Sequence, residues 1–365
     1  MESSFIWVTV DIMKQNTMVL HVGAAESFLP AFFNFLKDYV PLNNHKLLVH
    51  KTQRNWSEAF IDVIVAKTIF SYMVYFIKNA YCADKIILHG LFQPQLLLLL
   101  FFQPWLHSKC YWFIWGGDLY VYQDKKRDLK WKVREFIRRP VIRNVGHLVT
   151  YLEGDVNLAR KWYKAKGKYL ECLMYPSNLY KEFNLPEKEH STVNIQVGNS
   201  ASPSNNHLEI FDMLVAYKEQ NIKIFAPLSY GDPGYAKEVI RVGKLLFGEK
   251  FVSLTDFMEF NQYLEFLAQV DIAIFNHERQ QAMGNTITLL GLGKKVYMRN
   301  DVTPWAFFEK QGIKVFGVDK FNISLMPIEL AASNKEKIES HFSEQILSQQ
   351  LLEILDNGGS HALLK

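Results

Sequence analysis

Two short polar segments in the second half of the chain are typical of a site that binds an anion. The first lies in "VGNSASPSNNH" (197–207), where an apolar strand gives way to small polar residues before a helix. Unpaired backbone N–H groups at a helix N-terminus, together with the helix dipole, favour negative charge. An ordinary capped turn is the alternative, because Ser and Asn also favour turns. The candidate contacts are Gly198, Asn199, Ser200, Ser204 and Asn205.

The second segment, "RQQAMGNT" (279–286), follows another apolar strand and leads into another helix. An arginine offers a fork of fixed donors that suits a phosphate. Two such segments at strand ends of one domain indicate a diphosphate, although neither is a Walker P-loop or a G-x-G-x-x-G motif. A solvated loop is the alternative. The candidates are Arg279, Gln280, Gln281, Gly284, Asn285 and Thr286. Tyr230 of "APLSYGDPGY" can stack on a base or ribose, unless that segment is only a turn built from Gly and Pro.

The first half of the chain carries a different set of candidates in "WFIWGGDLYVY" (112–122). Gly116 and Gly117 would let a substrate approach the backbone closely, and Trp115 suits the apolar face of a sugar. Asp118 can act as a general base or bind a sugar hydroxyl, unless it only caps the next helix. His89 in "LHGLFQP" also ends a predicted strand, but a lone histidine is more often structural than catalytic.

The segment "DKKRDLKWKVREFIRRPVIRN" (124–144) combines many cations, beginning with Lys125, with interleaved apolar residues. This amphipathic pattern suits anionic lipid headgroups or a lipid pyrophosphate. The candidates are Arg134, Arg138 and Arg139. A solvated basic face is the plain alternative, and a nucleic-acid surface comes last because no DNA- or RNA-binding motif accompanies it.

These segments must be positioned by an alternation of short strands and helices, which predicts βαβ units and parallel sheets. In the first half we expect strands at 17–22, 45–50, 84–90, 110–116 and 147–152, with helices that include one from about Ser57. A polar stretch then resembles a linker, and the alternation restarts at 193–198, 222–228, 251–255, 271–275, 294–298 and 313–317. The pattern predicts two doubly wound α/β domains that face a central cleft.

The expected domain limits follow from these changes in pattern. Residues 1–16 form an N-terminal extension, 17–180 an acceptor-binding Rossmann-like domain and 181–192 the linker. Residues 193–345 form a nucleotide-sugar-binding Rossmann-like domain, and 346–365 a C-terminal helix.

Composition limits the class of protein. The chain has 365 residues, of which 49% are hydrophobic and 21% charged, and this is the profile of a folded protein large enough for two domains. The three cysteines are far apart, so neither a zinc site nor a disulfide framework is expected. The N-terminus does not read as a signal peptide, and the apolar run at 96–102 is too short to span a bilayer.

Five segments together resemble glycosyltransferase family 56: "HGLFQP", "FIWGGDLY", "VGNSASPSNNH", "YLEFLAQVDIAIF" and "RQQAMGN". The resemblance covers the chain from about Asn16 and implies a GT-B fold. It also implies transfer of a deoxyamino sugar, similar to 4-acetamido-4,6-dideoxygalactose (Fuc4NAc), from a dTDP-sugar to an undecaprenyl-pyrophosphate-linked saccharide. The setting would be synthesis of enterobacterial common antigen or O-antigen, at the cytoplasmic face of the bacterial inner membrane.

The resemblance assigns expected roles to particular residues. It implies donor contacts at Asn199, Ser204, Asn205, Arg279, Gln280, Gln281 and Gly284, and an acceptor side that includes His89, Gly90 and Asp118. No cofactor other than the donor is expected, and no metal, since the chain has no D-x-D motif. If the configuration inverts, Asp118 or His89 should be the base; if it is retained, the leaving phosphate can take the proton. A non-catalytic scaffold and a sugar-nucleotide epimerase are the alternatives.

Overall fold

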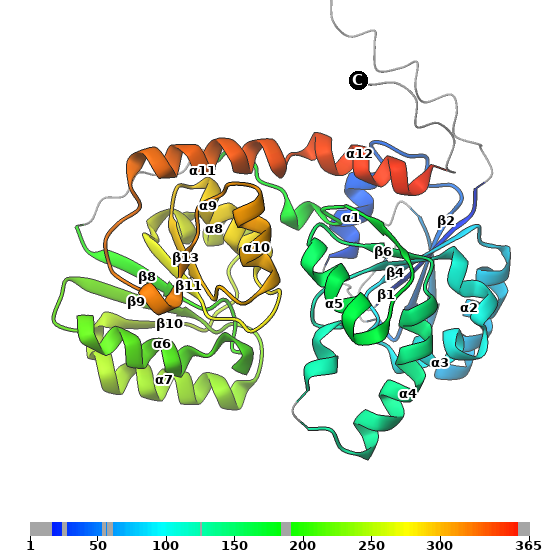
Figure 1. Cartoon of the computed structure of the whole chain (residues 1–365), viewed down its shortest axis with the longest axis horizontal. Coiled ribbons are helices and arrows are strands. Elements are labelled where there is room, and N and C mark those ends of the chain that lie inside the picture. Colours follow the sequence, from blue (N-terminus) through cyan, green and yellow to red (C-terminus); the bar gives the residue numbers. More distant parts are fainter. Residues whose placement is uncertain are drawn as a thin grey trace, which may run out of the picture. The chain divides into compact units, whose positions relative to one another are not determined.

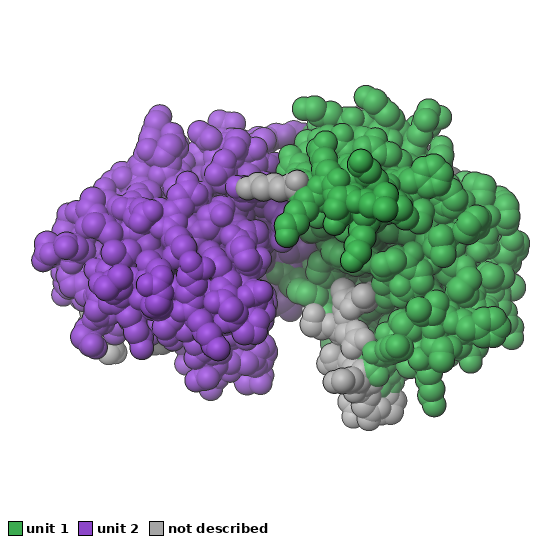
Figure 2. Space-filling view, turned by 90° about the horizontal axis from the view of Figure 1, so that it is seen from below, with its two compact units in different colours: residues 1–177, 344–365 green, residues 178–343 purple. Residues whose placement is uncertain are grey.

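The structure, a computed structural model, describes residues 17–23, 28–52, 56, 61–124, 126–183 and 191–356. The N-terminal extension, Lys125 and most of the predicted linker therefore lie outside the described residues. The chain forms two compact units (Figure 2). The first comprises residues 1–177 and 344–365, and the second comprises residues 178–343.

The first unit is built on a seven-stranded parallel sheet with the order β3-β2-β1-β4-β5-β6-β7. Its central strands are almost wholly buried, as expected for a parallel sheet covered by helices on both faces. The strands are β1 (Val19–Gly23), β2 (His45–His50), β3 (Asp62–Ala66), β4 (Lys85–His89), β5 (Cys110–Phe113), β6 (His147–Val149) and β7 (Lys168–Leu170).

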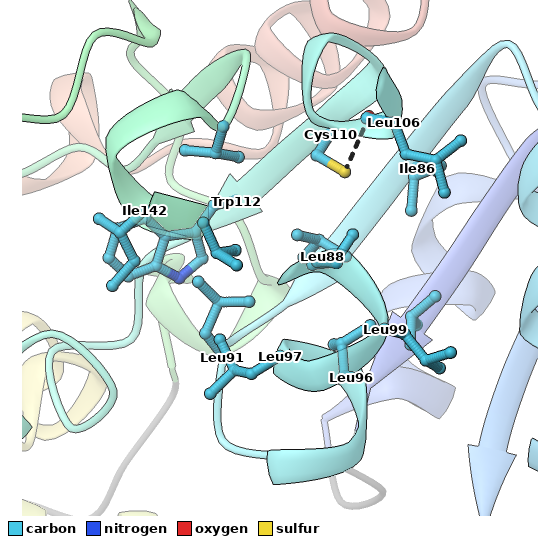
Figure 3. Packing of buried hydrophobic residues seen from close by; sticks show 14 of the residues in the cluster. Ile86, Leu88, Leu91, Leu96, Leu97, Leu99, Leu106, Cys110, Trp112 and Ile142 are labelled. Atoms are coloured by element: carbon cyan, nitrogen blue, oxygen red, sulfur yellow. Dashed lines mark hydrogen bonds between the residues drawn. The ribbon is translucent and has the colours of Figure 1, made fainter. Parts of the chain in front are cut away.

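Helices cover both faces of this sheet (Figure 1). One face packs against α2, α3, α4 and α5, and in Figure 3 Leu96, Leu97 and Leu99 of α3 gather with Ile86 and Leu88 of β4 in this core. The other face is covered by α1. The helices are α1 (Leu29–Leu36), α2 (Ile69–Cys82), α3 (Pro94–Phe102), α4 (Leu129–Asn144), α5 (Glu153–Tyr163) and α12 (Glu344–Leu355), with short 3-10 turns η2 (Pro104–Lys109) and η3 (Tyr120–Gln123).

The region after residue 60 corrects the prediction of a helix from about Ser57. Residues 57–60 lie outside the described residues, but Asp62–Ala66 form strand β3, which pairs with β2 along its whole length. Its β-branched run "VIV" favours a strand. Helix α2 begins only at Ile69, where Thr68 and Ser71 form a capping box.

The last helix, α12, belongs to the first unit although it ends the described chain. The Nζ atom of Lys85, at the start of β4, donates to the carbonyl groups of Ile354 (2.6 Å) and Asp356 (2.8 Å). A cation at the C-terminus of a helix satisfies its last carbonyl groups and complements the helix dipole. The chain therefore returns to its first unit after completing the second.

The second unit repeats the design with a six-stranded parallel sheet in the order β10-β9-β8-β11-β12-β13. The strands are β8 (Val193–Val197), β9 (Ile222–Pro227), β10 (Phe251–Leu254), β11 (Ile272–Phe275), β12 (Lys295–Met298) and β13 (Phe316–Gly317). The helices are α6 (His207–Leu214), α7 (Pro233–Phe247), α8 (Phe260–Gln269), α9 (Met283–Gly291), α10 (Thr303–Lys310) and α11 (Ile328–His341), with the 3-10 turn η5 (Pro203–Asn205) before α6.

The prediction of two doubly wound α/β domains is confirmed. In each sheet the strand order reverses at one point, between β1 and β4 and between β8 and β11. Open sheets of this kind bind ligands beyond the carboxyl ends of the strands at that point. Both predicted anion-binding segments follow β8 and β11 and therefore lie at this position. Among the described helices, none is long and apolar enough to cross a bilayer.

Candidate functional site

The two segments predicted to bind a diphosphate meet in the second unit through their side chains. The hydroxyl of Ser204 donates to Oε1 of Gln281 over 2.7 Å. The amide of Gln281 in turn donates to Oδ1 of Asn199 over 3.3 Å. A polar surface formed by both segments therefore lies at the switch point of the sheet.

A third loop, after β9, joins the same surface. The side-chain amide of Asn199 donates to the Tyr230 hydroxyl over 2.8 Å. Two backbone hydrogen bonds join Ala201 to this loop. The Ala201 N–H donates to the Tyr230 carbonyl (2.7 Å), and the Asp232 N–H donates to the Ala201 carbonyl (2.9 Å). Gly231 adopts a φ of 122°, and a Cβ there would lie 2.7 Å from the Ala201 carbonyl oxygen. Glycine is thus required for the two loops to approach this closely.

Some of the predicted ligand contacts support the loops from below. Asn205 is fully buried, and its Oδ1 accepts from the backbone N–H of Asn199 (2.9 Å) and lies 2.8 Å from Nε2 of His277. Ser200 is also buried and accepts from the Asn205 amide. Burial lowers the pKa of His277 to about 3, so that its ring is neutral at pH 7. Asn205 and Ser200 therefore shape the site.

Gly198 has a conformation that other residues rarely adopt. Its φ is 67°, and a Cβ would lie 2.6 Å from Nε2 of the buried His207 and 2.7 Å from Oδ1 of Asn205. The tight turn after β8 therefore depends on a residue without a side chain.

The segment at 279–286, before α9, also contains both buried and partly exposed residues. Gln280 is buried, and the hydroxyl of buried Thr286 donates to the Ala282 carbonyl over 3.0 Å, within the first turn of the helix. Arg279 is half-buried, and its Nη1 donates to the Gln280 carbonyl over 3.0 Å. The partly exposed residues of this segment are Arg279, Gln281, Gly284 and Asn285.

A cavity of about 290 Å³ opens beside this polar surface. Asn199, Tyr230 and Asn285 form its polar wall, while Phe257, Phe260 and Tyr263 add an aromatic wall that the sequence interpretation did not include. The missed signal is "TDFMEF", an aromatic-rich segment that directly follows strand β10. An apolar cavity with a few convergent polar groups is typical of a site for a small planar ligand. The remaining lining residues are Pro227, Ser229, Leu254, Asp256 and Met258.

In the first unit, Asp118 is a fully buried acceptor of four hydrogen bonds. Its donors are the backbone N–H groups of Leu91 (2.8 Å), Trp115 (3.1 Å) and Leu119 (2.9 Å) and the indole of Trp112 (2.7 Å). Burial raises the pKa of Asp118, although these donors oppose that rise. The carboxylate thus ties the loop after β4 to the loop after β5. Both loops bend through glycines in the left-handed region, Gly90 at φ 84° and Gly116 at φ 74°; Gly117 follows Gly116, and its N–H donates to the carbonyl of Trp115.

Arg138 does not lie on the basic surface that the sequence suggested. Its side chain is 2% exposed and donates to the carbonyl groups of Leu91 and Asp118. Its guanidinium also lies 3.5 Å from the buried Glu135, which accepts from the Tyr163 hydroxyl as well. The reason is helical geometry, because residue 138 shares the inward face of α4 with residues 135 and 142. Arg138 therefore holds the same two loops as Asp118.

The other predicted arginines of α4 are more accessible. Arg134 lies 3.5 Å from Asp124 in an exposed ion pair, and Arg139 lies 3.5 Å from Glu135 and packs over the ring of Tyr122. Exposed ion pairs of this kind contribute little to stability.

His89 belongs to a buried row of imidazole rings. His21 lies between His45 (2.9 Å between ring nitrogens) and His89 (3.1 Å), and His89 lies 2.7 Å from the Tyr175 hydroxyl. The indole of Trp115 donates to the same hydroxyl over 3.0 Å. Burial lowers the pKa of His45 to about 4 and that of His89 to about 3. The three rings are therefore neutral at pH 7, and they position Trp115 and Tyr175.

Among the described residues, no group of three or more His, Cys, Asp or Glu side chains is arranged to hold a metal ion. Arg279 is the one cation in the segments 198–206 and 279–286, and the start of α9 offers backbone N–H groups beside it.

Comparison with protein families gives a match over almost the whole chain. Residues 11–352 match the family described as 4-alpha-L-fucosyltransferase, glycosyl transferase group 56. The chain belongs to glycosyltransferase family 56. The resemblance inferred from the five sequence segments is thereby confirmed, and the chain is a glycosyltransferase by family.

Solved structures of similar fold include several glycosyltransferases. Sucrose-phosphate synthase from Thermosynechococcus elongatus superimposes with a TM-score of 0.67 at 11% identity, covering 92% of this chain and 98% of that chain. WaaG, a glycosyltransferase involved in lipopolysaccharide biosynthesis, gives 0.62 at 12% identity, with 94% and 100% covered. HepE from Anabaena, solved in complex with UDP, gives 0.66 at 9% identity, with 93% and 99% covered. These similarities show the GT-B fold.

Proposed function

We propose that this family 56 member transfers a deoxyamino sugar, similar to Fuc4NAc, from a dTDP-sugar to an undecaprenyl-pyrophosphate-linked saccharide. The reaction would serve synthesis of a bacterial surface polysaccharide such as enterobacterial common antigen or O-antigen. The observation that carries the donor half of this proposal is the polar surface of Asn199, Ser204 and Gln281 beside the aromatic cavity of the second unit.

The donor fits this site in two parts. The diphosphate lies against the segments at 198–206 and 279–286, where backbone N–H groups and the Arg279 guanidinium offer donors to its oxygen atoms. The thymine ring enters the cavity of about 290 Å³, where it packs against Phe257 and Tyr263. Tyr230 and Asn199, which share a hydrogen bond, lie between the two parts.

Arg279 and the helix N-terminus stabilise the charge that develops on the departing diphosphate. We therefore propose a metal-independent reaction. The bond between the sugar C1 and the β-phosphate oxygen breaks, the acceptor oxygen bonds to C1, and the acceptor proton passes to a phosphate oxygen. Asp118 is buried with four donors and His89 is enclosed in a row of rings, so we assign both to the support of the loops. This assignment favours retention of configuration, with the leaving group as base.

The acceptor half of the proposal concerns the first unit. Trp115, held by Tyr175 and packed beside Phe28, presents an aromatic surface of the kind that binds sugar rings. The acceptor's lipid chain places the enzyme at the cytoplasmic face of the inner membrane as a peripheral protein. No nucleic acid is involved.

Calorimetry with dTDP, UDP and GDP tests the donor site. We expect dTDP to bind most tightly, and Arg279→Ala to weaken its binding at least tenfold, because Arg279 is the one cation in the two segments proposed to hold the diphosphate. Arg241→Ala, which removes an exposed arginine from α7 of the same unit, is the control and should leave affinity unchanged. Equal affinity in the parent and Arg279→Ala would remove this segment from the diphosphate site.

Incubation with dTDP-Fuc4NAc and a lipid-linked acceptor tests the reaction itself. Formation of product and release of dTDP are expected together. Binding without either outcome would point to a scaffold, and conversion of the donor in the absence of acceptor would point to an epimerase.

A further inference from the structure

The outer surface of the first unit is unusually apolar over α2, α3, η2 and α4. Of the twenty-two large hydrophobic side chains that are exposed in the described part of the chain, thirteen lie between Ile69 and Phe136. We call the following residues of that stretch the apolar face: Ile69, Phe70, Val74, Tyr75, Ile77, Tyr81, Leu98, Phe102, Trp105, Leu129, Val133 and Phe136.

Helix α3 shows why this surface needs a partner. Its inward side chains, such as Leu96 and Leu100, fill the core, yet its outward side chains Leu98 and Phe102 are also apolar. A helix that is apolar on all sides is normally buried, whereas a surface helix carries polar residues outward. The sequence "PQLLLLLFF" has one polar residue, Gln95, and no charge.

The neighbouring helices extend the same surface. On α2 the exposed positions Phe70, Val74 and Tyr81 follow helical spacing on one side. On α4 the exposed Leu129, Val133 and Phe136 do the same. Helix α3 contacts both α2 and α4, and the three lie together over one face of the sheet (Figure 1).

Side-chain contacts join these helices into one face. The Phe101 and Phe136 rings lie 5.7 Å apart, between α3 and α4. The Trp105 indole donates to the Tyr81 hydroxyl over 3.0 Å, between η2 and α2. Tryptophan and tyrosine are the side chains that prefer the interface between water and lipid.

Charge identifies the partner. The stretch from Ile69 to Lys109 contains a single acidic residue, Asp84, and the one acidic residue of α4, Glu135, is buried. Exposed cations flank the apolar residues instead, with Lys78 on α2 and Lys130, Lys132 and Arg143 on α4. Two copies of this face would bring like charges together, whereas a bilayer with anionic headgroups offers both apolar depth and opposite charge.

We propose that the apolar face is a membrane-docking surface that inserts its aromatic and aliphatic side chains among anionic lipids. The inference deepens the proposed function, from which it takes the membrane as partner. The proposed membrane surface excludes Arg138, which is buried. It includes α2 and α3, which the basic segment at 124–144 did not indicate.

Sedimentation with vesicles of phosphatidylethanolamine and phosphatidylglycerol tests the proposal without any sugar transfer. The variant Phe70→Glu, Phe102→Glu, Phe136→Glu changes side chains that are 77%, 65% and 70% exposed, so folding should survive. We expect its vesicle binding to fall at least tenfold. The matched control is Leu245→Glu, Leu325→Glu, Ile328→Glu, which changes three exposed residues of the second unit and should bind as the parent does.

Two further measurements complete the design. Lys130→Glu, Lys132→Glu should weaken binding to phosphatidylglycerol vesicles and reduce the sensitivity of the remaining binding to salt, because less of the attraction is electrostatic. Circular dichroism and dTDP affinity should be unchanged in all variants, since none alters the donor site.

Three results would overturn the proposal. They are a parent protein that does not sediment with these vesicles, a triple variant that binds as well as the parent, and a parent dimer that dissociates in the triple variant without any lipid binding. The last would assign the face to a second copy. Failure of sugar transfer with normal vesicle binding would instead count against the proposed function alone.

Discussion

The loops at the carboxyl ends of the two sheets are built from similar residues but are held in different ways. In the first unit, Asp118 and Arg138 are buried and direct their polar atoms into the loops around Leu91 and Trp115. In the second unit, Asn199 lines a cavity and accepts a long hydrogen bond, of 3.3 Å, from the half-buried Gln281. A polar residue that is enclosed supports a loop, whereas one at a rim can exchange its partner for a ligand.

The difference has an energetic consequence. A hydrogen bond to a buried charge contributes about 1.5–3 kcal/mol, and its loss leaves the partner groups unsatisfied. A bond between neutral side chains contributes about 1 kcal/mol, and beside a cavity water can replace it. Substitutions in the first set should therefore affect folding, and those in the second set should affect binding.

The largest effect is expected for Asp118→Ala, which leaves the N–H groups of Leu91, Trp115 and Leu119 and the Trp112 indole without their acceptor. We expect the free energy of unfolding to fall by about 3–5 kcal/mol. Urea unfolding followed by tryptophan fluorescence measures this, because Trp305 is the only one of the eight tryptophans outside the first unit. The control, Asp124→Ala, removes an exposed partner of Arg134 and should cost less than about 1 kcal/mol. Equal effects of the two variants would remove the contrast between enclosed and exposed carboxylates.

Acid should weaken the first unit more steeply than the second. In the folded protein, burial lowers the pKa of His45 to about 4 and of His89 to about 3, and that of His21 lies well below its usual value. The unfolded chain therefore binds protons first as the pH falls below about 6.5, and stability decreases from there towards pH 4. Each histidine contributes about 1.4 kcal/mol per pH unit, or about 2 kcal/mol at pH 5.

The second unit offers two such rings, His207 and His277, with pKa values lowered to about 4 and about 3. Hydrogen exchange at pH 7, 6 and 5 can follow both units separately. A first unit whose protection does not change over this range would contradict the assignment of three neutral rings.

A smaller effect is expected for Gly198→Ala. The left-handed conformation and the close His207 ring should together destabilise the second unit by about 1–3 kcal/mol. The displaced turn should also weaken dTDP binding, because Asn199 follows directly. Gly234→Ala, at the exposed start of α7 without positive φ, is the control; its Cβ would meet only Oδ1 of the capping Asp232, at 3.1 Å, so stability should change by less than about 1 kcal/mol. Thermal unfolding measures the stability of both variants, and calorimetry measures their affinity for dTDP.

The smallest effect on stability is expected for Gln281→Ala. Its side chain is half-buried and bonds only to Ser204 and Asn199 among the contacts described, so the cost should be below about 1 kcal/mol. Affinity for dTDP should nevertheless fall about tenfold, which corresponds to about 1.4 kcal/mol of binding free energy. A large loss of stability with unchanged affinity would place Gln281 with Asp118 as a support.

The sequence predicted the features that local chemistry determines. Alternating strands and helices identified both sheets, and the small polar residues after β8 and β11 identified the loops that meet through Ser204 and Gln281. The edge strand β3 was missed because only two residues separate its end at Ala66 from α2, so the apolar residues of both read as one helical segment. The aromatic wall of the cavity was missed because Phe257 and Tyr263 become neighbours of Tyr230 only through the order of the strands.

Burial of charged groups was the least predictable feature. Asp118 accepts from nearby residues but also from Leu91, which is 27 residues away and separated from it by α3, η2 and β5, so no spacing in the sequence reveals that contact. Arg138 stands in a run of cations, and only the orientation of α4 against its neighbours shows that it faces inward while Arg139 does not.

The return of α12 to Lys85 has a consequence for biosynthesis and for protein engineering. The first unit cannot be completed until the ribosome has made residue 355, whereas the second unit is complete at residue 343. The part that is translated first is thus the last to be finished, and until then a nascent chain exposes the apolar surface that the buried side chains of α12 cover. A fragment ending at Ser177 would lack this helix, so expression of the first unit alone requires residues 344–356 to be supplied, either joined by a short linker or as a separate peptide.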